Sequence, residues 1–390
     1  MTVKVSKPAI NVREELADLR KPTGLAGEAM LAAETPQQQF QLIGAGRRNL
    51  LINGDMRIAQ AATSITTIGT GGYQACDRWR IQTNLNHTTH TWAQVADAPD
   101  GFKYSSKLTV GTGVTPSTGD FGRLYQRMEV QDAKHLQWGT SKPQPITLSF
   151  WVKASIAGKY GGVFSASATG VYVFAYNVNQ ADVWEYKTYT VTDGMTTFGA
   201  ESADNGIGFG VCFDLGEGPS RSSQEGQNPT TSAGTMGLTG GVKILATSGA
   251  TWQITGVQLE QSKFHTPFEH RSYGEELALC QRYFQSVYDS AMSAIAPGRG
   301  ASGGDAVVVA IPIPVALRAS PAVASSGIYY VYDHNSRISS TPNSVTVSNY
   351  PTNGSIIALY LAFSGIVCDD DRVNLISSLG NTTLTLDAEL

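Results

Sequence analysis

Residues 146–153 read Ile-Thr-Leu-Ser-Phe-Trp-Val-Lys, and this stretch decides the fold class. An apolar side chain occupies every second position: Ile146, Leu148, Phe150 and Val152. Successive side chains of a β-strand point to opposite faces of the sheet, so this alternation predicts a strand with one buried face. Trp252–Glu260 alternates in the same way but shifts at Gly256, which predicts a second strand with a β-bulge near that glycine.

Similar short runs extend in both directions, separated by clusters of Gly, Ser, Thr and Pro. The further predicted strands are Leu50–Ile52, Trp79–Thr83, Ser106–Val110, Leu124–Val130, Val171–Asn177, Thr188–Val191, Gly208–Asp214 and Val242–Ala246. Short strands at this spacing are typical of a β-sandwich or jelly roll, which we predict for residues 47–270. Within it, residues 216–241 form a long polar loop that is either functional or held by a neighbour.

A second group of strands follows near the C-terminus and predicts a small β-sandwich over residues 298–390. Its members are Ala306–Ile313, Ile328–Asp333, Ser344–Val347, Ile356–Phe363 and Thr382–Leu386. No repeat of fixed period is visible, which argues against a solenoid. The fold class is therefore mainly β.

Helix signals flank the jelly roll on both sides. Ser272 and Glu275 form a capping box that opens a predicted helix to about Ser290, the linking helix of residues 271–297. Residues 1–46 contain two shorter capping signals, Asn11 with Glu14 and Thr35 with Gln38. Two short helices there have little apolar surface, so we expect residues 1–46 to pack against another chain; a flexible leader is the alternative.

Composition limits the classes of function. Charged residues make up 15% of the 390 residues, below the roughly 25% of average globular proteins. The net charge of −4 does not favour nucleic acid as a partner. No apolar run is long enough to predict membrane insertion. The four cysteines (Cys76, Cys212, Cys280 and Cys368) are far apart, and we expect reduced thiols.

Sequence signatures of enzymes are missing. The chain has no zinc-protease, P-loop, nucleophile-elbow or dinucleotide-binding motif, so we expect it not to be an enzyme. His87 with His90, and Asp369 to Asp371, are too few or too crowded to define a metal site. Glycoside hydrolysis needs a facing pair of acids, and the spacing of the available carboxylates selects none: Glu185, Glu201, Asp204 and Asp214.

Aromatic residues are the best candidates for ligand contact. Five have polar neighbours in sequence: Trp92, Trp138, Trp184, Tyr186 and Tyr189. An exposed aromatic ring can stack on the C–H face of a sugar, so these five are candidate glycan contacts, with the core or a subunit interface as the alternative. Trp151 and Trp252 alternate within strands, and we expect them in the core.

Several motifs resemble virion proteins of tailed bacteriophages. Asn49-Leu-Leu-Ile-Asn-Gly-Asp55 followed by Asp77-Arg-Trp79 looks like the start of the carbohydrate-binding-module-like jelly roll of tail-fibre proteins. Trp252–Glu260, running into Thr266-Pro-Phe-Glu269, resembles its last strand. Arg271–Phe284 is similar to the helix that follows this module, and Ile313–Pro321 to a strand of the distal domain. The similarity spans about residues 47–321.

The resemblance implies a structural subunit of a phage particle, most simply a tail-fibre-like appendage that attaches to the host surface. Under this hypothesis residues 1–46 bind phage tail or capsid proteins, the chain forms a homotrimer, and a host glycan is its ligand. The location is then the virion, after assembly in the host cytoplasm. A head fibre, a decoration protein, a tail-nozzle-associated protein and a glycan-cleaving tailspike are the alternatives.

The resemblance also implies one kind of metal site. Jelly rolls of this kind often hold a structural calcium between the first and last strands, which makes Asn53, Asp55 and Glu260 candidate ligands. The alternative is that Asn53-Gly54-Asp55 is only a turn, because Asn-Gly is a favoured turn dipeptide. No other cofactor is expected.

Overall fold

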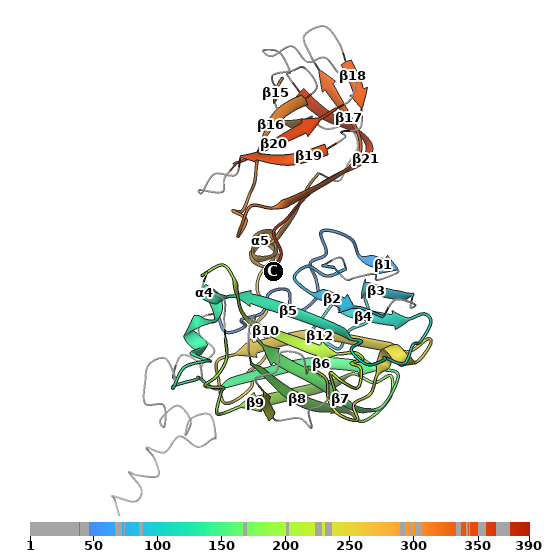
Figure 1. Ribbon diagram of the computed structural model, residues 1–390, viewed down its shortest axis with the longest axis vertical. Helices are drawn as coiled ribbons and strands as arrows, with labels where there is room; N and C mark the ends of the chain where they lie inside the picture. The colour runs from blue at the N-terminus through green and yellow to red at the C-terminus, as the bar shows by residue number, and fades with distance from the viewer. Residues whose placement is uncertain are drawn as a thin grey trace, which may run out of the picture. The chain divides into compact units, whose positions relative to one another are not determined.

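The structure is a computed structural model of the chain (Figure 1). It describes residues 39, 47–66, 72–73, 75–85, 89–166, 170–199, 203–222, 228–230, 236–288, 294–296, 298–300, 306–332, 337–340, 342, 344–349, 356–363 and 375–390. The chain divides into two compact units, Met1–Arg48 and Asn49–Leu390. Of the helices predicted within residues 1–46, only Gln39 lies among the described residues, and it is helical; the rest lie outside them.

Two six-stranded antiparallel sheets form the larger part of this unit (Figure 1). The first, called the β6 sheet, has the order β1 (Ser64–Thr66), β3 (His90–Val95), β4 (Ser105–Val110), β12 (Thr251–Glu260), β6 (Ile146–Ala154) and β9 (Glu185–Val191). The second, called the β5 sheet, has the order β11 (Asn228–Thr230), β8 (Val171–Val178), β7 (Gly158–Ser165), β10 (Ile207–Asp214), β5 (Gly122–Glu129) and β2 (Arg80–Thr83).

The two sheets pack face to face over one hydrophobic core. Phe150 of the β6 sheet and Phe213 of the β5 sheet are both fully buried, with ring centroids 5.1 Å apart. Trp252 of β12 lies 5.7 Å from the same Phe213 ring. The alternation read in Ile146–Lys153 therefore marks the inner face of a β-sandwich, as predicted.

Most strands predicted for the jelly roll are present within a few residues of the expected ends. The bulge predicted near Gly256 is confirmed, because the register of β12 against β6 shifts between Thr255 and Gln258 and Gly256 has a φ of +61°. Two predicted strands are wrong: Leu50–Ile52 is irregular, and Val242–Ala246 contains the short 3₁₀ helix η2 (Ile244–Ala246). Four strands were not predicted: β1, β3, β7 and β11.

Short helices follow two of the strands of this sandwich. α4 (Val130–Ala133) and the 3₁₀ helix η1 (Lys134–Leu136) follow β5. α5 (Tyr273–Gln281) begins as predicted, with Ser272 Oγ accepting a hydrogen bond from the Glu275 amide at 3.2 Å. The predicted end near Ser290 is wrong, because the chain turns into strand β13 (Phe284–Tyr288).

The C-terminal strands form two further antiparallel sheets. One has the order β13, β21 (Leu375–Asp387), β17 (Ala322–Tyr332) and β18 (Arg337–Ser340), with β14 (Ala294–Ala296) also paired to β21. The other has the order β15 (Gly298–Gly300), β16 (Ala306–Pro312), β20 (Ile356–Ala362) and β19 (Ser344–Asn349). A separate cluster of buried side chains, including Val307, Leu359 and Leu386, fills the space between them.

Cys76, Cys212 and Cys280 are free and buried, which confirms the expected reduced thiols for these three; Cys368 lies outside the described residues. None of the helices in the described part of the chain has the length and apolar character needed to cross a membrane.

Candidate functional site

The Asn49–Asp55 motif holds the start of the sandwich against its last strand. The Asn49 Oδ1 accepts hydrogen bonds from the amides of Leu51 (3.0 Å) and Leu259 (3.1 Å). Asn53 is fully buried; its side-chain amide donates to the carbonyls of Ile58 and Asp77, both at 2.9 Å. The side-chain amides of Asn49 and Asn53 thus bond backbone groups that a paired strand would otherwise satisfy, and the motif has a structural role.

The motif at the start of α5 joins the same network. Arg271 Nη1 lies 3.2 Å from Glu276 Oε1 and also donates to the Leu51 carbonyl at 3.1 Å. Both side chains of this ion pair are 5% exposed. The Glu276 carboxylate also accepts a hydrogen bond of 2.5 Å from the Asn53 amide. We call Asn49, Asn53, Arg271 and Glu276 the joint.

The candidate calcium ligands do not form a described cluster. Asp55 pairs with Arg57 at 3.1 Å, while Glu260 accepts hydrogen bonds from the Thr266 amide and hydroxyl, both at 2.8 Å. Asn53 uses its side-chain oxygen on the Ile58 amide. Among the described residues no group of three His, Cys, Asp or Glu side chains could hold a metal ion. Each of the three candidates thus holds a turn in this structure.

Three of the five aromatic candidates pack into the protein. Trp92 is 1% exposed and belongs to the core, so its ring offers no face to a sugar. Trp138 is half-buried among Phe164, Phe198 and Phe209, and its indole N–H donates to the Gln144 carbonyl at 2.9 Å. Tyr189 packs against the core.

The other two lie on the outer face of the β6 sheet and are joined there by Trp151. The ring of Tyr186, which is 38% exposed, lies 5.3 Å from that of Trp151, its neighbour across β6 and β9. Trp151 is half-buried on this outer face, so its expected place in the core was wrong. Lys153 of β6 lies beside Trp184, with its Nζ 5.3 Å from the centroid of the Trp184 ring. We call Trp151, Trp184 and Tyr186 the aromatic patch.

Polar groups hold the patch in place. Asp97 accepts hydrogen bonds from Lys153 Nζ (2.5 Å) and from the Trp184 indole N–H (3.2 Å). Burial acts to raise the pKa of Asp97, but these two hydrogen bonds outweigh it and hold the pKa below its usual value. Asp97 is therefore a carboxylate at neutral pH and fixes the orientation of the Trp184 ring.

Gly256 makes room for the patch. A Cβ at this position would lie 3.1 Å from the Trp151 ring and 2.7 Å from that of Phe102, and its φ of +61° disfavours any other residue. We expect Gly256→Ala to lower the free energy of unfolding by about 1–2 kcal/mol through backbone conformation alone. Urea denaturation measures this; Gly274→Ala, whose Cβ would meet nothing, is the control, and equal effects would contradict the prediction.

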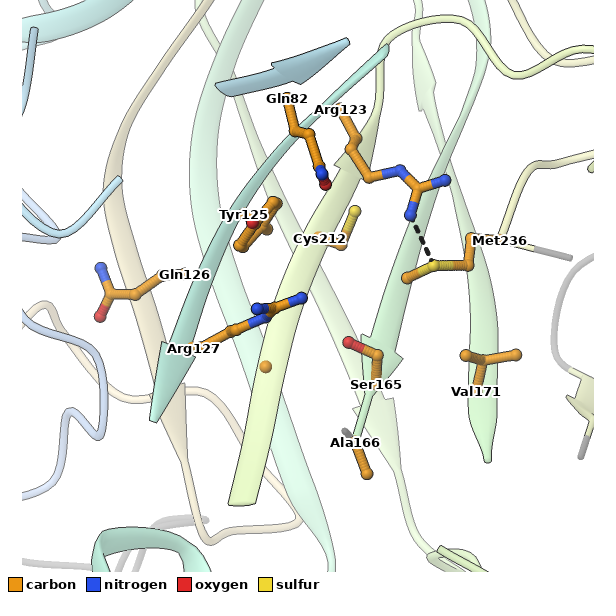
Figure 2. Close-up of a pocket in the computed structure, with 11 residues that line it drawn as sticks. Gln82, Arg123, Tyr125, Gln126, Arg127, Ser165, Ala166, Val171, Cys212 and Met236 are labelled. Atoms are coloured by element: carbon orange, nitrogen blue, oxygen red, sulfur yellow. Dashed lines mark hydrogen bonds between the residues drawn. The ribbon is translucent and has the colours of Figure 1, made fainter. Parts of the chain in front are cut away.

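A hollow of about 180 Å³ opens on the outer face of the other sheet (Figure 2). Its floor is Gly210 of β10, which pairs with Arg127 of β5 on one side and Ser165 of β7 on the other. In the next pair of the same strands, Cys212 lies opposite Tyr125. The hollow exists because a glycine stands between larger neighbours. Its remaining lining is Gln82, Arg123, Gln126, Ala166, Val171 and Met236.

The described part of the long loop 216–241 covers one end of this face. Leu238 and Met236 pack on it with Tyr125 and Cys212. Glu217 Oε1 lies 2.8 Å from both Nε and Nη2 of Arg123. Burial, opposed by Arg123, raises the pKa of Glu217 to about 8, and burial likewise raises that of Asp214 to about 6. Arg123 is thus paired with a buried carboxylate, and its Nη1 also donates to Met236 Sδ at 2.8 Å (Figure 2).

Arg127 differs from Arg123. Its guanidinium carbon stands 4.7 Å from the centroid of the Tyr125 ring, and among the described residues it has no carboxylate partner. Figure 2 shows this guanidinium between Tyr125 and Ser165, while Gln126 points to the other side of the strand. Burial, against the charges of Arg127 and Arg80, raises the pKa of Tyr125.

Sequence reasoning missed the hollow although it predicted strand β5. In Arg123-Leu-Tyr-Gln-Arg127 the residues on the outer face are two arginines and a tyrosine at alternate positions, and Gln82 of β2 lies opposite Arg123. The polar and aromatic residues at alternate positions of β5 were the signal for this face that the sequence offered. The depression itself depends on the pairing of Gly210, which the sequence alone does not show.

Comparison with known proteins gives distant matches only. No protein-family model matches the sequence, and no curated protein does. A solved structure of the enzymatically active domain of tailspike protein 4 from bacteriophage CBA120 is 10% identical, with a TM-score of 0.29 over 55% of this chain and 21% of that chain. A putative sugar-binding protein from Bacteroides thetaiotaomicron is 12% identical, with a TM-score of 0.33 over 55% of this chain and 100% of that one.

A third match is the family 11 carbohydrate-binding module of a cellulosomal cellulase from Clostridium thermocellum. It is 8% identical, with a TM-score of 0.26 over 52% of this chain and 97% of that chain. With TM-scores this low, the description of the fold and of its two outer faces rests on the geometry of the chain itself.

Proposed function

We propose that this chain is a structural subunit of a tailed-phage particle, a tail-fibre-like appendage that binds a host surface glycan without cleaving it. Residues 1–46 would bind phage tail or capsid proteins, and the chain would assemble as a homotrimer. The Asn49–Asp55, Asp77–Trp79 and Arg271–Phe284 motifs support the phage assignment through their resemblance to tail-fibre proteins. The β-sandwich that these motifs frame supports it further.

The aromatic patch is the observation that carries the glycan-binding part. Tyr186 is 38% exposed beside Trp151, and its ring lies 5.8 Å from that of His265, whose sequence neighbour Phe264 is 65% exposed. Large exposed aromatic rings cost free energy in water, and a sugar offers both C–H faces to stack on them and hydroxyls for polar neighbours. Lys153 and Asp97 stand beside Trp184 as such neighbours.

The site suits binding better than cleavage. Asp97, the carboxylate of the patch, is held by Lys153 and Trp184, and its lowered pKa makes it a poor proton donor at neutral pH. Glycosidases use a facing pair of acids, one of them with a raised pKa. The described lining of the hollow contains no carboxyl group.

The binding test compares patch variants on the full chain. We expect the double variant Trp184→Ala/Tyr186→Ala to lose tenfold or more of its affinity, about 1.4 kcal/mol, for an immobilised bacterial surface polysaccharide in a biosensor panel. Tyr273→Ala is the matched control, because Tyr273 is an equally large ring, 59% exposed, on α5. No binding by the unchanged chain, or an unchanged affinity of the double variant, would refute the proposal. Reducing ends released from the bound polysaccharide would indicate a glycan-cleaving tailspike instead.

Two measurements test the place in the particle. The mass of the purified chain should correspond to three copies, and a monomer would contradict the homotrimer. Immunogold labelling of phage particles would use one antibody against residues 1–46 and another against the exposed surface around Phe264. The first should label a tail attachment point and the second a distal position. Label on the head would instead indicate a head fibre or a decoration protein.

A further inference from the structure

The hollow on the β5 sheet combines positive charge with hydrogen-bonding groups that are not used. Two of its eleven lining residues are arginines, and none is an aspartate or a glutamate. Arg80 of β2 adds a third cation beside it, 5.8 Å from the Tyr125 ring. Buried Glu217 pairs with Arg123, which leaves Arg127 without a carboxylate partner among the described residues.

Arg127 is already positioned for a ligand. Stacking on Tyr125 restrains its guanidinium, and the backbone of the same residue is fixed because Arg78 Nη2 donates to the Arg127 carbonyl at 2.6 Å. No described side chain engages the fork of donors that this guanidinium presents. A restrained guanidinium loses little conformational freedom when it binds, and its fork matches the two oxygens of a carboxylate.

Tyr125 gives a second, independent sign of a ligand. This residue is 5% exposed, and its buried hydroxyl lies beside the Arg80 side chain without a hydrogen bond of good geometry among the described residues. A buried hydroxyl without a partner is costly, and such groups usually meet a water or a ligand. Gln82 and Ser165 also line the hollow, and Figure 2 shows no hydrogen bond from their side chains to the other lining residues drawn.

We propose that this hollow binds one acidic sugar residue, with its carboxylate on Arg127 and its hydroxyls on Tyr125, Gln82 and Ser165. The volume of about 180 Å³ is below the roughly 300–1,000 Å³ of pockets for drug-sized ligands, which fits a single ring. Val171 and Met236 supply the apolar wall that a sugar ring needs beside its polar contacts. The inference rests on the proposed glycan binding, but it concerns the sheet opposite to the aromatic patch.

The test titrates the full chain with six small probes by calorimetry. D-glucuronate, D-galacturonate and N-acetylneuraminate are the acidic sugars, D-glucose and D-galactose their neutral counterparts, and inorganic phosphate the plain anion. We expect at least one acidic sugar to bind, no neutral sugar to bind comparably, and added NaCl to weaken the affinity. Arg127→Gln should weaken it about ten- to a hundredfold, because hydrogen bonds to a charged group are lost. Arg127→Lys should restore only part, since it keeps the charge but not the fork.

Two further variants guard against loss of folding. Gly210→Ala fills the floor of the hollow without touching a guanidinium. Its Cβ would lie 3.2 Å from the Gln126 carbonyl oxygen, 3.4 Å from Ser165 Oγ and 3.5 Å from Arg127 Cγ, so a shift of a few tenths of an ångström accommodates it. It should abolish binding while the unfolding transition is kept. Arg221→Gln is the matched control, because Arg221 also stacks on an aromatic ring, 4.9 Å from Phe121, but does not line the hollow.

The possible outcomes separate the two sites. If none of the three acidic sugars binds, or if Arg127→Gln and Gly210→Ala bind as well as the unchanged chain, the inference is overturned. If phosphate binds as tightly as the best acidic sugar, the hollow is a general anion site and the assignment to a sugar is overturned. If either of these results is found but the patch variants still lose polysaccharide binding, the inference fails and the proposed function stands. Acidic-sugar binding lost in Trp184→Ala/Tyr186→Ala but kept in Arg127→Gln would assign that ligand to the patch.

Discussion

Arg271→Met should lower the free energy of unfolding by about 3–5 kcal/mol, as expected when one partner of a buried ion pair is removed. The substitution keeps most of the side-chain volume but leaves the Glu276 carboxylate, 5% exposed, without its nearest cation. It also removes the donors to the Asn49 and Leu51 carbonyls. Urea denaturation followed by tryptophan fluorescence measures the loss.

A less deeply buried ion pair on the edge strand β9 provides the control for this prediction. Lys187 Nζ lies 2.6 Å from Glu185 Oε2, with both side chains 14% exposed, and Lys187→Met should cost about 1 kcal/mol or less. Adding Glu276→Gln to Arg271→Met should recover part of the stability, because a carboxylate left with the more distant Arg57, at 3.8 Å, is replaced by a neutral amide. Equal losses in the Arg271 and Lys187 variants would show that the joint is not a buried network.

Trp79→Ala should lower the free energy of unfolding by a similar amount, about 3–5 kcal/mol, because a large buried ring is removed from a close-packed core. Trp79 is fully buried, its ring lies 6.5 Å from that of Phe213, and its indole N–H donates to the Asn53 carbonyl at 2.9 Å. The loss would therefore affect both the core and the joint. Thermal and urea unfolding of the purified variant would show it.

Trp184→Ala is the matched control, since it removes the same ring from a half-buried position on the outer face of the β6 sheet. We expect a cost of about 1 kcal/mol. A loss for Trp79→Ala no larger than this would mean that the Asp77–Trp79 motif does not anchor the core, and the structural reading of that motif would then be wrong.

Alternation predicted the strands of the sandwich wherever one face is apolar and the other polar, as in Ile146–Lys153. It failed where buried residues are neighbours in sequence: Ile244 and Leu245 are both fully buried, and together they read as a strand but form η2. It also failed at Leu50–Ile52, where the Leu50 amide pairs with the Leu259 carbonyl of β12 but side chains take the other bonds. Asn49 and Arg271 bond the backbone of Leu51, and Gln126 bonds that of Ile52.

Long-range pairing explains the wrong end of α5. Phe284 and Val287 continue the helical spacing of Leu277 and Cys280, yet Phe284 pairs with Asp387, far along the chain. The local capping signal at Ser272 was sufficient for the start of the helix, because a cap depends only on neighbours in sequence. Its end depends on a partner that local patterns do not show.

The candidate site was predictable only in part, for the same reason. Polar neighbours in sequence suggested exposure for Trp92, but on a strand the neighbours face the other side, and Trp92 is buried. Trp151 was expected in the core, but it alternates with the buried Phe150 and Val152 and therefore faces outward. Trp184 and Tyr186 were identified from sequence, but their proximity to Trp151 follows from the register of β9 against β6. The predicted metal ligands and glycan contacts remain predictions.

The last residues of the chain return to the point where α5 leaves the sandwich. The Ala388 amide donates to the Tyr283 carbonyl at 2.8 Å, and Glu389 pairs with buried Arg78. The end of β21, from Leu384 to Asp387, pairs antiparallel with β13. The C-terminal strands are thus held at both their first and their last residues. A pulling force on the C-terminal strands is shared by the two chain segments that hold them, β13 and the end of β21, and it shears the hydrogen bonds between these segments. Rotation about a single linker cannot relieve a twist, because two segments make the connection. For a protein tethered at one end, this attachment would transmit torque as well as tension.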